Sequence, residues 1–138
     1  MRIIGYIDLI GPKVSLERVS GLVRYAPWKL SQIGLKKNPP LVDIWSYRSP
    51  YFELRDAALD EDVARLLRLH SELIGAPHIG DATMKYAFLT LVPVREDLEE
   101  EFATILEPGT LALMAERGLA LQISPEAVMP VGIQLPVA

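Results

Sequence analysis

The chain has 138 residues, of which 50% are apolar and 23% are charged, so it is long enough to bury the core of a single domain. This composition excludes a disordered chain, and the absence of cysteine excludes disulfides, thiol catalysis and cysteine-ligated zinc or iron–sulfur sites. No apolar run is long enough to cross a bilayer and the first residues lack the pattern of a secretory signal, so we expect a cytoplasmic protein without membrane association.

The formal net charge of −4 is unevenly distributed along the chain. Residues 1–48 contain eight Lys/Arg and three Asp/Glu, whereas residues 49–138 contain six Lys/Arg and fifteen Asp/Glu. The negative total argues against a nucleic-acid partner, because nucleic acids attract positive surfaces. The acidic second part is either ordinary solvated surface or favours a protein partner with a basic surface.

Three segments of different pattern occupy the first forty residues. Residues 2–10 alternate apolar and polar side chains, which predicts a half-buried strand. Ser15 can cap a predicted helix that continues to Tyr25 and stops before Pro27. Residues 27–40 show no period and contain two adjacent prolines, which predicts an irregular or extended connection.

The clearest predicted strand and helix lie in the middle of the chain. Residues 42–48 predict a strand that Ser49 and Pro50 interrupt, and residues 51–54 predict a short continuation or a second strand. Residues 60–74 place apolar side chains at helical spacing, and the glycine that follows is suited to end a helix.

The last third of the chain alternates between apolar and charged segments. Residues 84–92 are apolar on both faces, which predicts a central strand that the following proline closes. Residues 96–107 contain six acids and fit either a short amphipathic helix or a charged loop. Residues 109–117 then predict a final helix, and residues 119–123 predict a final strand.

This order of elements predicts one α+β domain over residues 1–123, with a ferredoxin-like antiparallel or mixed sheet and helices mainly on one face. Residues 124–138 contain three prolines, and we expect this tail to pack on the domain or at a partner surface. The expected core draws on strands and helices throughout the chain: Ile7, Val63, Leu66, Leu67, Phe88 and Leu121.

Several short segments carry a resemblance to a known family: Tyr6-Ile7-Asp8, residues 15–23, Trp45-Ser46-Tyr47, residues 59–69 and residues 111–123. On these segments the chain resembles the bacterial DUF4279 family, a domain of unknown function. The resemblance implies a small cytoplasmic bacterial protein with an immunity or partner-binding role, and it supplies no catalytic residues. The chain departs from the family in its proline-rich connection and in its tail after Ile123.

The only histidines, His70 and His78, have Glu72 and Asp81 nearby in the sequence, so we considered a carboxylate–histidine metal site. A site of that kind usually takes two ligands from one element at short spacing, and these histidines do not have that spacing. The pattern favours packed or capping histidines, and we expect no metal and no other cofactor.

Three consecutive acids, Asp60, Glu61 and Asp62, begin the predicted central helix. The positive end of a helix explains them better than acid–base chemistry does, and Glu61 is also spaced to pair with Arg65. The sequence contains no glycine-rich phosphate loop and no nucleophile elbow, so no catalytic residue is assigned and a non-enzymatic role is favoured. An enzyme whose acids come from distant loops is the alternative.

Aromatic and acidic residues on two predicted strands form a candidate binding surface. Tyr6 and Asp8 share one face of the first strand, and Asp43, Trp45 and Tyr47 share one face of the strand at residues 42–48. If these faces align, they form the kind of aromatic surface that is favoured at interfaces, whereas Trp45 in the core is the alternative. The competing contact surface is an acidic run: Glu99, Glu100 and Glu101.

These observations favour a non-enzymatic protein-binding module, of immunity or adaptor type, that binds a toxin or another basic partner. A small-molecule-binding regulatory or enzymatic domain is the alternative. RNA binding is disfavoured because the chain lacks the basic, glycine-aromatic segment of RNA-recognition domains.

Overall fold

The computed structural model describes residues 2–12, 33–38, 42–70, 78–79, 82–83, 86–94, 106–124 and 132–136. Its strands and helices follow one another along the chain as β1 (Arg2–Pro12), β2 (Ile33–Asn38), β3 (Val42–Arg48), β4 (Phe52–Leu54), the 3-10 helix η2 (Asp56–Ala58), α2 (Leu59–Leu69), β5 (His78–Ile79), β6 (Ala82–Thr83), β7 (Tyr86–Val94), α4 (Pro108–Glu116), β8 (Ala120–Ile123) and β9 (Ile133–Gln134). The fold is α+β, as predicted.

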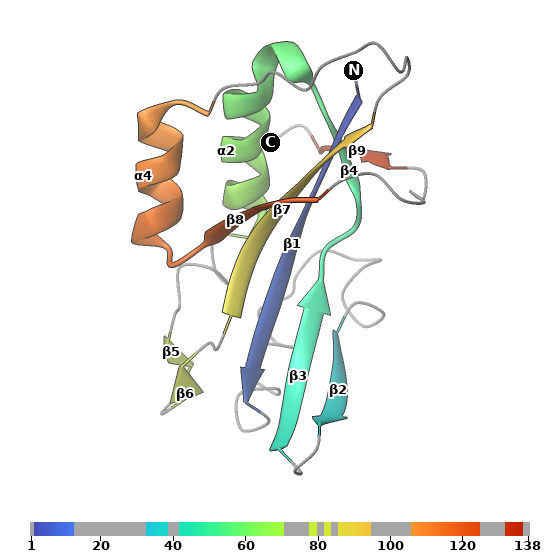
Figure 1. The fold of residues 1–138 in the computed structure, drawn as a ribbon, viewed down its shortest axis with the longest axis vertical. Helices are drawn as coiled ribbons and strands as arrows, with labels where there is room; N and C mark the ends of the chain where they lie inside the picture. Colours follow the sequence, from blue (N-terminus) through green and yellow to red (C-terminus); the bar gives the residue numbers. More distant parts are fainter. Residues whose placement is uncertain are drawn as a thin grey trace.

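Strand β1 runs through the middle of a mixed sheet of seven strands (Figure 1). One edge of β1 pairs antiparallel with β7, and the other edge pairs antiparallel with β3 and then with β4. The sheet extends outward from these strands through β2, which is antiparallel to β3, and through β8 and β9, which are parallel to β7 and β4. Strands β5 and β6 form a separate two-stranded sheet.

The two faces of this sheet differ in what covers them. On the helix face, Ile3, Ile7 and Leu9 of β1 pack in one core cluster with residues of α2 and α4. On the second face, Ile4 packs with Val92 and Val94 of β7. Because Ile3 and Ile4 are both fully buried, the start of β1 is buried on both faces, whereas its pattern predicted a half-buried strand.

The expected core is confirmed at four positions and wrong at two. Ile7, Val63, Leu66 and Leu67 are buried together on the helix face. Phe88 is only partly buried, because it pairs with Asp8 and therefore shares the second face with that residue. Leu121 is 38% exposed, because β8 pairs only with β7 in the part of the sheet that the structure describes.

The predicted break between two strands is confirmed at Ser49 and Pro50. Strands β3 and β4 lie along the same edge of β1, and buried Ser49 stands between them. The N–H of Ser49 donates to the Ile7 carbonyl at 2.9 Å, and the N–H of Ile7 donates to Ser49 Oγ at 2.9 Å. Ser49 therefore satisfies both backbone groups of Ile7 where the regular ladder stops.

One prediction from proline was too coarse and another was wrong. Residues 27–40 were expected to be an irregular or extended connection, and they include the extended strand β2, whose pairing with β3 supplies the hydrogen bonds that the local pattern did not predict. Pro93 was expected to close its strand, but it stands opposite Ile3 within β7. A proline is tolerated there because, among the described residues, the pairing of β7 with β8 ends at Leu91, so no strand partner needs an N–H from Pro93 on that side.

Some predictions fall wholly or partly outside the described residues. The predicted helix at residues 15–25 lies outside them, as does all of residues 96–107 except the last two. The central helix was predicted over residues 60–74, but α2 ends at Leu69 with His70 as its C-cap. Of the tail, residues 132–136 are described, and they include β9.

The acids in the first turn of α2 bind groups beyond the helix. Asp60 Oδ1 accepts hydrogen bonds from the N–H of Glu107 at 2.9 Å and from Thr110 Oγ1 at 2.6 Å, which ties α2 to the start of α4. The expected Glu61–Arg65 pair is replaced by others: Glu61 lies 3.7 Å from Arg55 Nη2, and Arg65 Nη1 lies 3.4 Å from Asp62 Oδ1.

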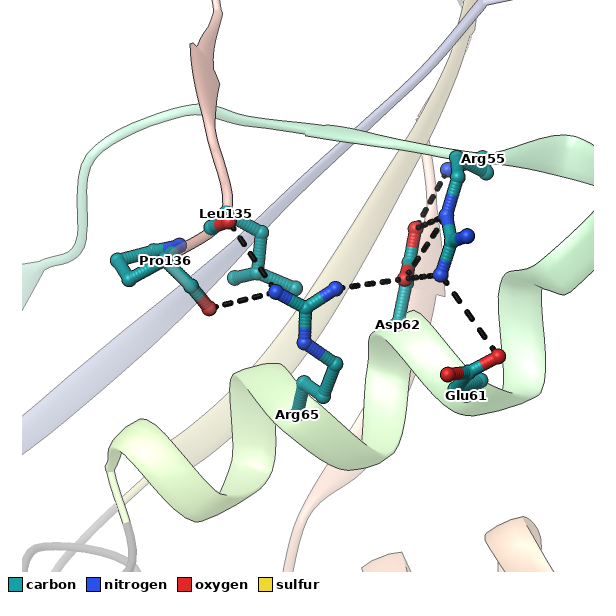
Figure 2. A network of polar contacts seen from close by, with 6 residues as sticks. All are labelled: Arg55, Glu61, Asp62, Arg65, Leu135 and Pro136. Atoms are coloured by element: carbon teal, nitrogen blue, oxygen red, sulfur yellow. Dashed lines mark hydrogen bonds and ion pairs between the residues drawn. The ribbon is translucent and has the colours of Figure 1, made fainter. Parts of the chain in front are cut away.

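Asp62 is a buried carboxylate between two arginines (Figure 2). Arg55 donates to it from its backbone N–H at 2.8 Å and from Nη2 at 2.7 Å. Burial alone would raise the pKa of Asp62, but the hydrogen bonds from Arg55 and the charges of Arg55 and Arg65 outweigh it and lower the pKa below its usual value. Asp62 is therefore ionised and fixes the start of α2 against the end of β4.

Helix α4 begins with Pro108 in its first turn, a position where a missing N–H costs nothing. The chain reverses after α4 at Gly118, whose φ of 68° lies in the left-handed region that glycine adopts readily. The N–H of Leu119 then donates to the Met114 carbonyl at 2.9 Å, and the chain continues into β8. No helix among the described residues is long and apolar enough to cross a membrane.

We predict that Leu67→Ala lowers the free energy of unfolding by about 2–5 kcal/mol, because Leu67 is 1% exposed in the centre of the core. Leu121→Ala is the matched control and should cost less than about 1 kcal/mol. Urea denaturation of both variants measures the difference. Equal losses would show that the core face of α2 is assigned wrongly.

Candidate functional site

Four polar and aromatic residues meet on the second face of the sheet, away from α2 and α4. They are Tyr6 and Asp8 of β1, Arg48 at the end of β3, and Tyr51 between β3 and β4, and we call them the Tyr–Arg cluster. The antiparallel register places Asp8 directly opposite Arg48, and directly opposed residues share a face. The sheet register therefore assembles the cluster from residues that are about forty positions apart.

Arg48 is the centre of the Tyr–Arg cluster. Its Nε donates to Asp8 Oδ1 at 2.7 Å and its Nη2 donates to Asp8 Oδ2 at 3.3 Å, which is the two-pronged geometry of strong arginine–carboxylate pairs. A third donor, Nη1, lies 3.4 Å from the Tyr51 hydroxyl. The hydrogen bond to Asp8 raises the pKa of Arg48 above its ordinary value, which outweighs the effect of partial burial.

The two tyrosines form an aromatic support for the guanidinium group. The Arg48 Cζ atom lies 5.0 Å from the centroid of the Tyr6 ring, within cation–π range. The rings of Tyr6 and Tyr51 meet edge to face, with centroids 4.9 Å apart and planes at 79°. Both rings pack against the apolar cluster of Ile4, Val92 and Val94, so apolar contacts with the sheet hold the rings in position.

The exposure of the Tyr–Arg cluster suits it to contact with another molecule. The Arg48 side chain is 54% exposed, whereas that of Asp8 is 18% exposed. The carboxylate is thus partly covered and holds the arginine, while the guanidinium reaches solvent. The cluster combines one paired charge with two ring systems, and such a surface can stack on a partner and donate hydrogen bonds to it.

The structure brings together only part of the predicted binding surface. Tyr6 and Asp8 are in the Tyr–Arg cluster, but Tyr47 is opposite Leu9, 2% exposed and part of the core on the helix face. The two predicted faces therefore do not align. Asp8 stands opposite Arg48, so Tyr47, the neighbour of Arg48 on β3, points to the other face of the sheet.

The other predicted binding residues are placed only by their backbone or not at all. Trp45 pairs with Gly11 of β1, and Asp43 pairs with Lys37 of β2. Glu99, Glu100 and Glu101 lie outside the described residues. Whether these residues contact a partner stays a prediction.

Sequence reasoning missed Arg48 and Tyr51. One signal was available: if Tyr47 is placed in the core, its neighbour Arg48 must lie on the opposite face of the strand. The pairing with Asp8 could not be read, because it depends on the register between β1 and β3, which residues 13–41 separate in the sequence.

Among the described residues, the two histidines do not form a metal-binding group. His70 is buried, with Nε2 2.8 Å from the Tyr47 hydroxyl and Nδ1 3.1 Å from the Leu66 carbonyl. A carbonyl can only accept, so Nδ1 carries the proton of neutral His70 and Nε2 accepts from Tyr47. His78 belongs to β5, and among the described residues no group of three or more His, Asp or Glu could hold a metal ion.

Comparisons with models of protein families, with curated proteins and with solved structures found no match to this chain. The resemblance to the DUF4279 family therefore stays a prediction. Fold alone does not specify an activity, so the chemistry of the Tyr–Arg cluster is what indicates a function for this chain.

We predict that the protein loses stability between pH 7.5 and pH 5.5 because of His70. Burial lowers the pKa of His70 in the folded state, while unfolded histidine takes up a proton near pH 6.5. The unfolded state therefore binds more protons, and the free energy of unfolding should fall by up to about 1.4 kcal/mol per pH unit below pH 6.5.

Urea unfolding at pH 7.5, 6.5 and 5.5 measures this slope. His70→Gln should flatten it, whereas His78→Gln, the control at the other histidine, should leave it unchanged. A slope that survives in His70→Gln would assign the pH dependence to other groups.

Proposed function

We propose that this chain is a non-enzymatic protein-binding module whose contact surface is centred on the Tyr–Arg cluster. The supporting observation is that Arg48 is paired through two donors with Asp8, lies over the ring of Tyr6, and is still half exposed. Tyrosine and arginine are enriched among residues that dominate binding energy at protein interfaces. Side chains that are already held in place lose little conformational freedom when they bind.

The chemistry of the chain favours a partner with a basic surface. Residues 49–138 carry nine more acids than bases, and this field would accelerate encounter with a basic protein. The Tyr–Arg cluster would hold the complex afterwards, because Asp8 offsets the charge of Arg48, while the half-exposed guanidinium and the tyrosine rings that support it offer stacking and hydrogen-bond contacts to the partner. The acidic run from Glu99 to Glu101 and the Tyr–Arg cluster thus have different roles in one association.

The wider identity of the module is part of the same proposal. A cytoplasmic, bacterial, immunity-type protein of the DUF4279 family would bind a basic toxin in this way. A ferredoxin-like topology of the sheet would agree with two observations: β1 lies between antiparallel β3 and β7, and helices pack on one face.

The test begins with capture of partners from a lysate of the source organism on the immobilised protein, followed by binding kinetics with the purified partner. Tyr6→Ala and Arg48→Ala should each weaken binding by about 2 kcal/mol or more and mainly speed dissociation. Arg68→Ala removes an exposed arginine of α2 and is the matched control, with little expected effect.

Reversal of Glu99, Glu100 and Glu101 to lysine should mainly slow association and weaken its salt dependence. Full affinity in both cluster variants would refute the proposed contact surface. Specific retention of a small metabolite without any protein partner would support a regulatory small-molecule domain instead.

A further inference from the structure

The C-terminal part of the described chain, residues 132–136, lies across the domain like a bound peptide, and we call it the tail segment. Its strand β9 adds parallel to β4, so that Ile133 pairs with Phe52 and Gln134 pairs with Glu53. The N–H of Ile133 donates to the Tyr51 carbonyl at 2.7 Å. This is the arrangement in which an extended peptide adds a strand to the edge of a sheet.

One side chain of the tail segment is its apolar anchor. Leu135 is 7% exposed and belongs to the core cluster on the helix face, together with Leu54 of β4 and Leu66 of α2. Ile133, two residues earlier, is 40% exposed. The contribution of apolar burial therefore comes mainly from Leu135.

Arg65 of α2 clamps the backbone of the tail segment (Figure 2). Its Nη2 donates to the Leu135 carbonyl at 3.2 Å and to the Pro136 carbonyl at 2.6 Å. Its Nη1 lies 3.4 Å from Asp62 Oδ1, and Asp62 is itself held by Arg55. Asp62 thus orients Arg65 from within the domain. Arg65 in turn donates to backbone carbonyls, which any extended peptide would offer.

Gly132 sets a steric requirement at the other end of the tail segment. A Cβ atom added there would lie 2.8 Å from Cδ1 of Ile4 and 3.1 Å from Cγ of Glu53, closer than these atoms can approach without moving. The contacts therefore favour glycine at the first position, since a larger residue would displace the side chains of Ile4 and Glu53. Two less restricted positions follow, then a leucine and a carbonyl after it. In this chain that pattern is Gly-Ile-Gln-Leu-Pro.

We propose that the edge of β4, the core residues around Leu135, and Arg65 form a peptide-binding groove, and that the tail segment of a second copy of this chain exchanges with the chain's own tail segment in it. Every contact described above is between the tail segment and the body of the domain, so a tail from another copy makes the same contacts. The chain's own tail has the advantage of high effective concentration, which a second copy overcomes as protein concentration rises. This groove is distinct from the Tyr–Arg cluster, and its test does not require the partner proposed above.

The first experiment measures entry of a tail peptide into the groove of the full-length protein. The probe is a fluorescent peptide of residues 131–138, followed by anisotropy. Leu135→Ala weakens the anchor of the chain's own tail, and Ile133→Pro removes the N–H that bonds Tyr51 without touching the core. Both variants should bind the peptide roughly tenfold or more tightly than the wild type, whose groove is occupied.

Controls assign this binding to the groove. A peptide with alanine at the Leu135 position should not bind, and adding Arg65→Gln to either opened variant should weaken binding by roughly tenfold or more. Arg68→Gln, on the same helix, should have no effect. Failure of the peptide to bind Ile133→Pro, with circular dichroism showing that this variant is folded, would overturn the proposal.

The second experiment detects exchange between copies and uses the absence of native cysteine. Glu53 and Gln134 are register partners, and the Cα atoms of such neighbours are about 5 Å apart, within disulfide reach. One copy carries Glu53→Cys and the other carries Gln134→Cys, so a mixed disulfide forms in the paired geometry only when a tail crosses between copies.

Exchange predicts that, with equal amounts of the two variants, mixed dimers exceed the half share that random pairing of the thiols would give, and that this excess rises with protein concentration. Excess unlabelled peptide or Arg65→Gln should suppress it. A statistical mixture of the three disulfide dimers that is indifferent to the peptide would overturn the exchange.

Discussion

The register of β1 against β3 is the constraint on which both faces of the sheet depend. Ser49 holds this register, because its N–H and its Oγ bind both backbone groups of Ile7 at the point where β3 stops. With Ile7 in place, Asp8 stands opposite Arg48 and Leu9 stands opposite Tyr47. A slip of one residue would turn Arg48 toward the helices and lose its carboxylate partner, and an unpaired buried charge costs several kcal/mol.

The ionised Asp62 plays a similar positioning role on the helix face. A buried ion pair adds little net stability, since the cost of removing the charges from water offsets their attraction. Its effect here is geometric: one carboxylate receives the backbone and side chain of Arg55 and lies beside Arg65. The end of β4, the first turn of α2 and the tail segment are thereby fixed relative to one another.

The peptide-binding groove and the Tyr–Arg cluster are physically connected through Tyr51 and Ile4. The hydroxyl of Tyr51 contacts Arg48, while its backbone carbonyl accepts the N–H of Ile133. Ile4 lies beneath the rings of Tyr6 and Tyr51 and faces the place where a side chain on Gly132 would be. A tail segment in the groove, from either copy, therefore contacts Tyr51 and Ile4, and the Tyr–Arg cluster includes the first and packs on the second.

Local pattern predicted the elements whose residues are constrained by their immediate neighbours in sequence. The helical spacing around Val63, Leu66 and Leu67 identified the buried face of α2, and Ser49-Pro50 marked the break between β3 and β4. Pattern failed where pairing between distant strands decides the outcome. Strand β2 forms because β3 supplies its hydrogen bonds, and Leu121 is exposed because β8 lies at an edge of the described sheet.

By itself the sequence determined that this is an α+β domain, that Tyr6 and Asp8 share a strand face, and that α2 buries a stripe of apolar residues, since these follow from the periods of strands and helices. Only the tertiary structure decided that Arg48 and Tyr51 join Tyr6 and Asp8, that Tyr47 lies in the core with His70, and that Arg65 grips the tail segment. The reason is physical: periodicity states which residues share a face of one element, whereas register and packing state which faces meet.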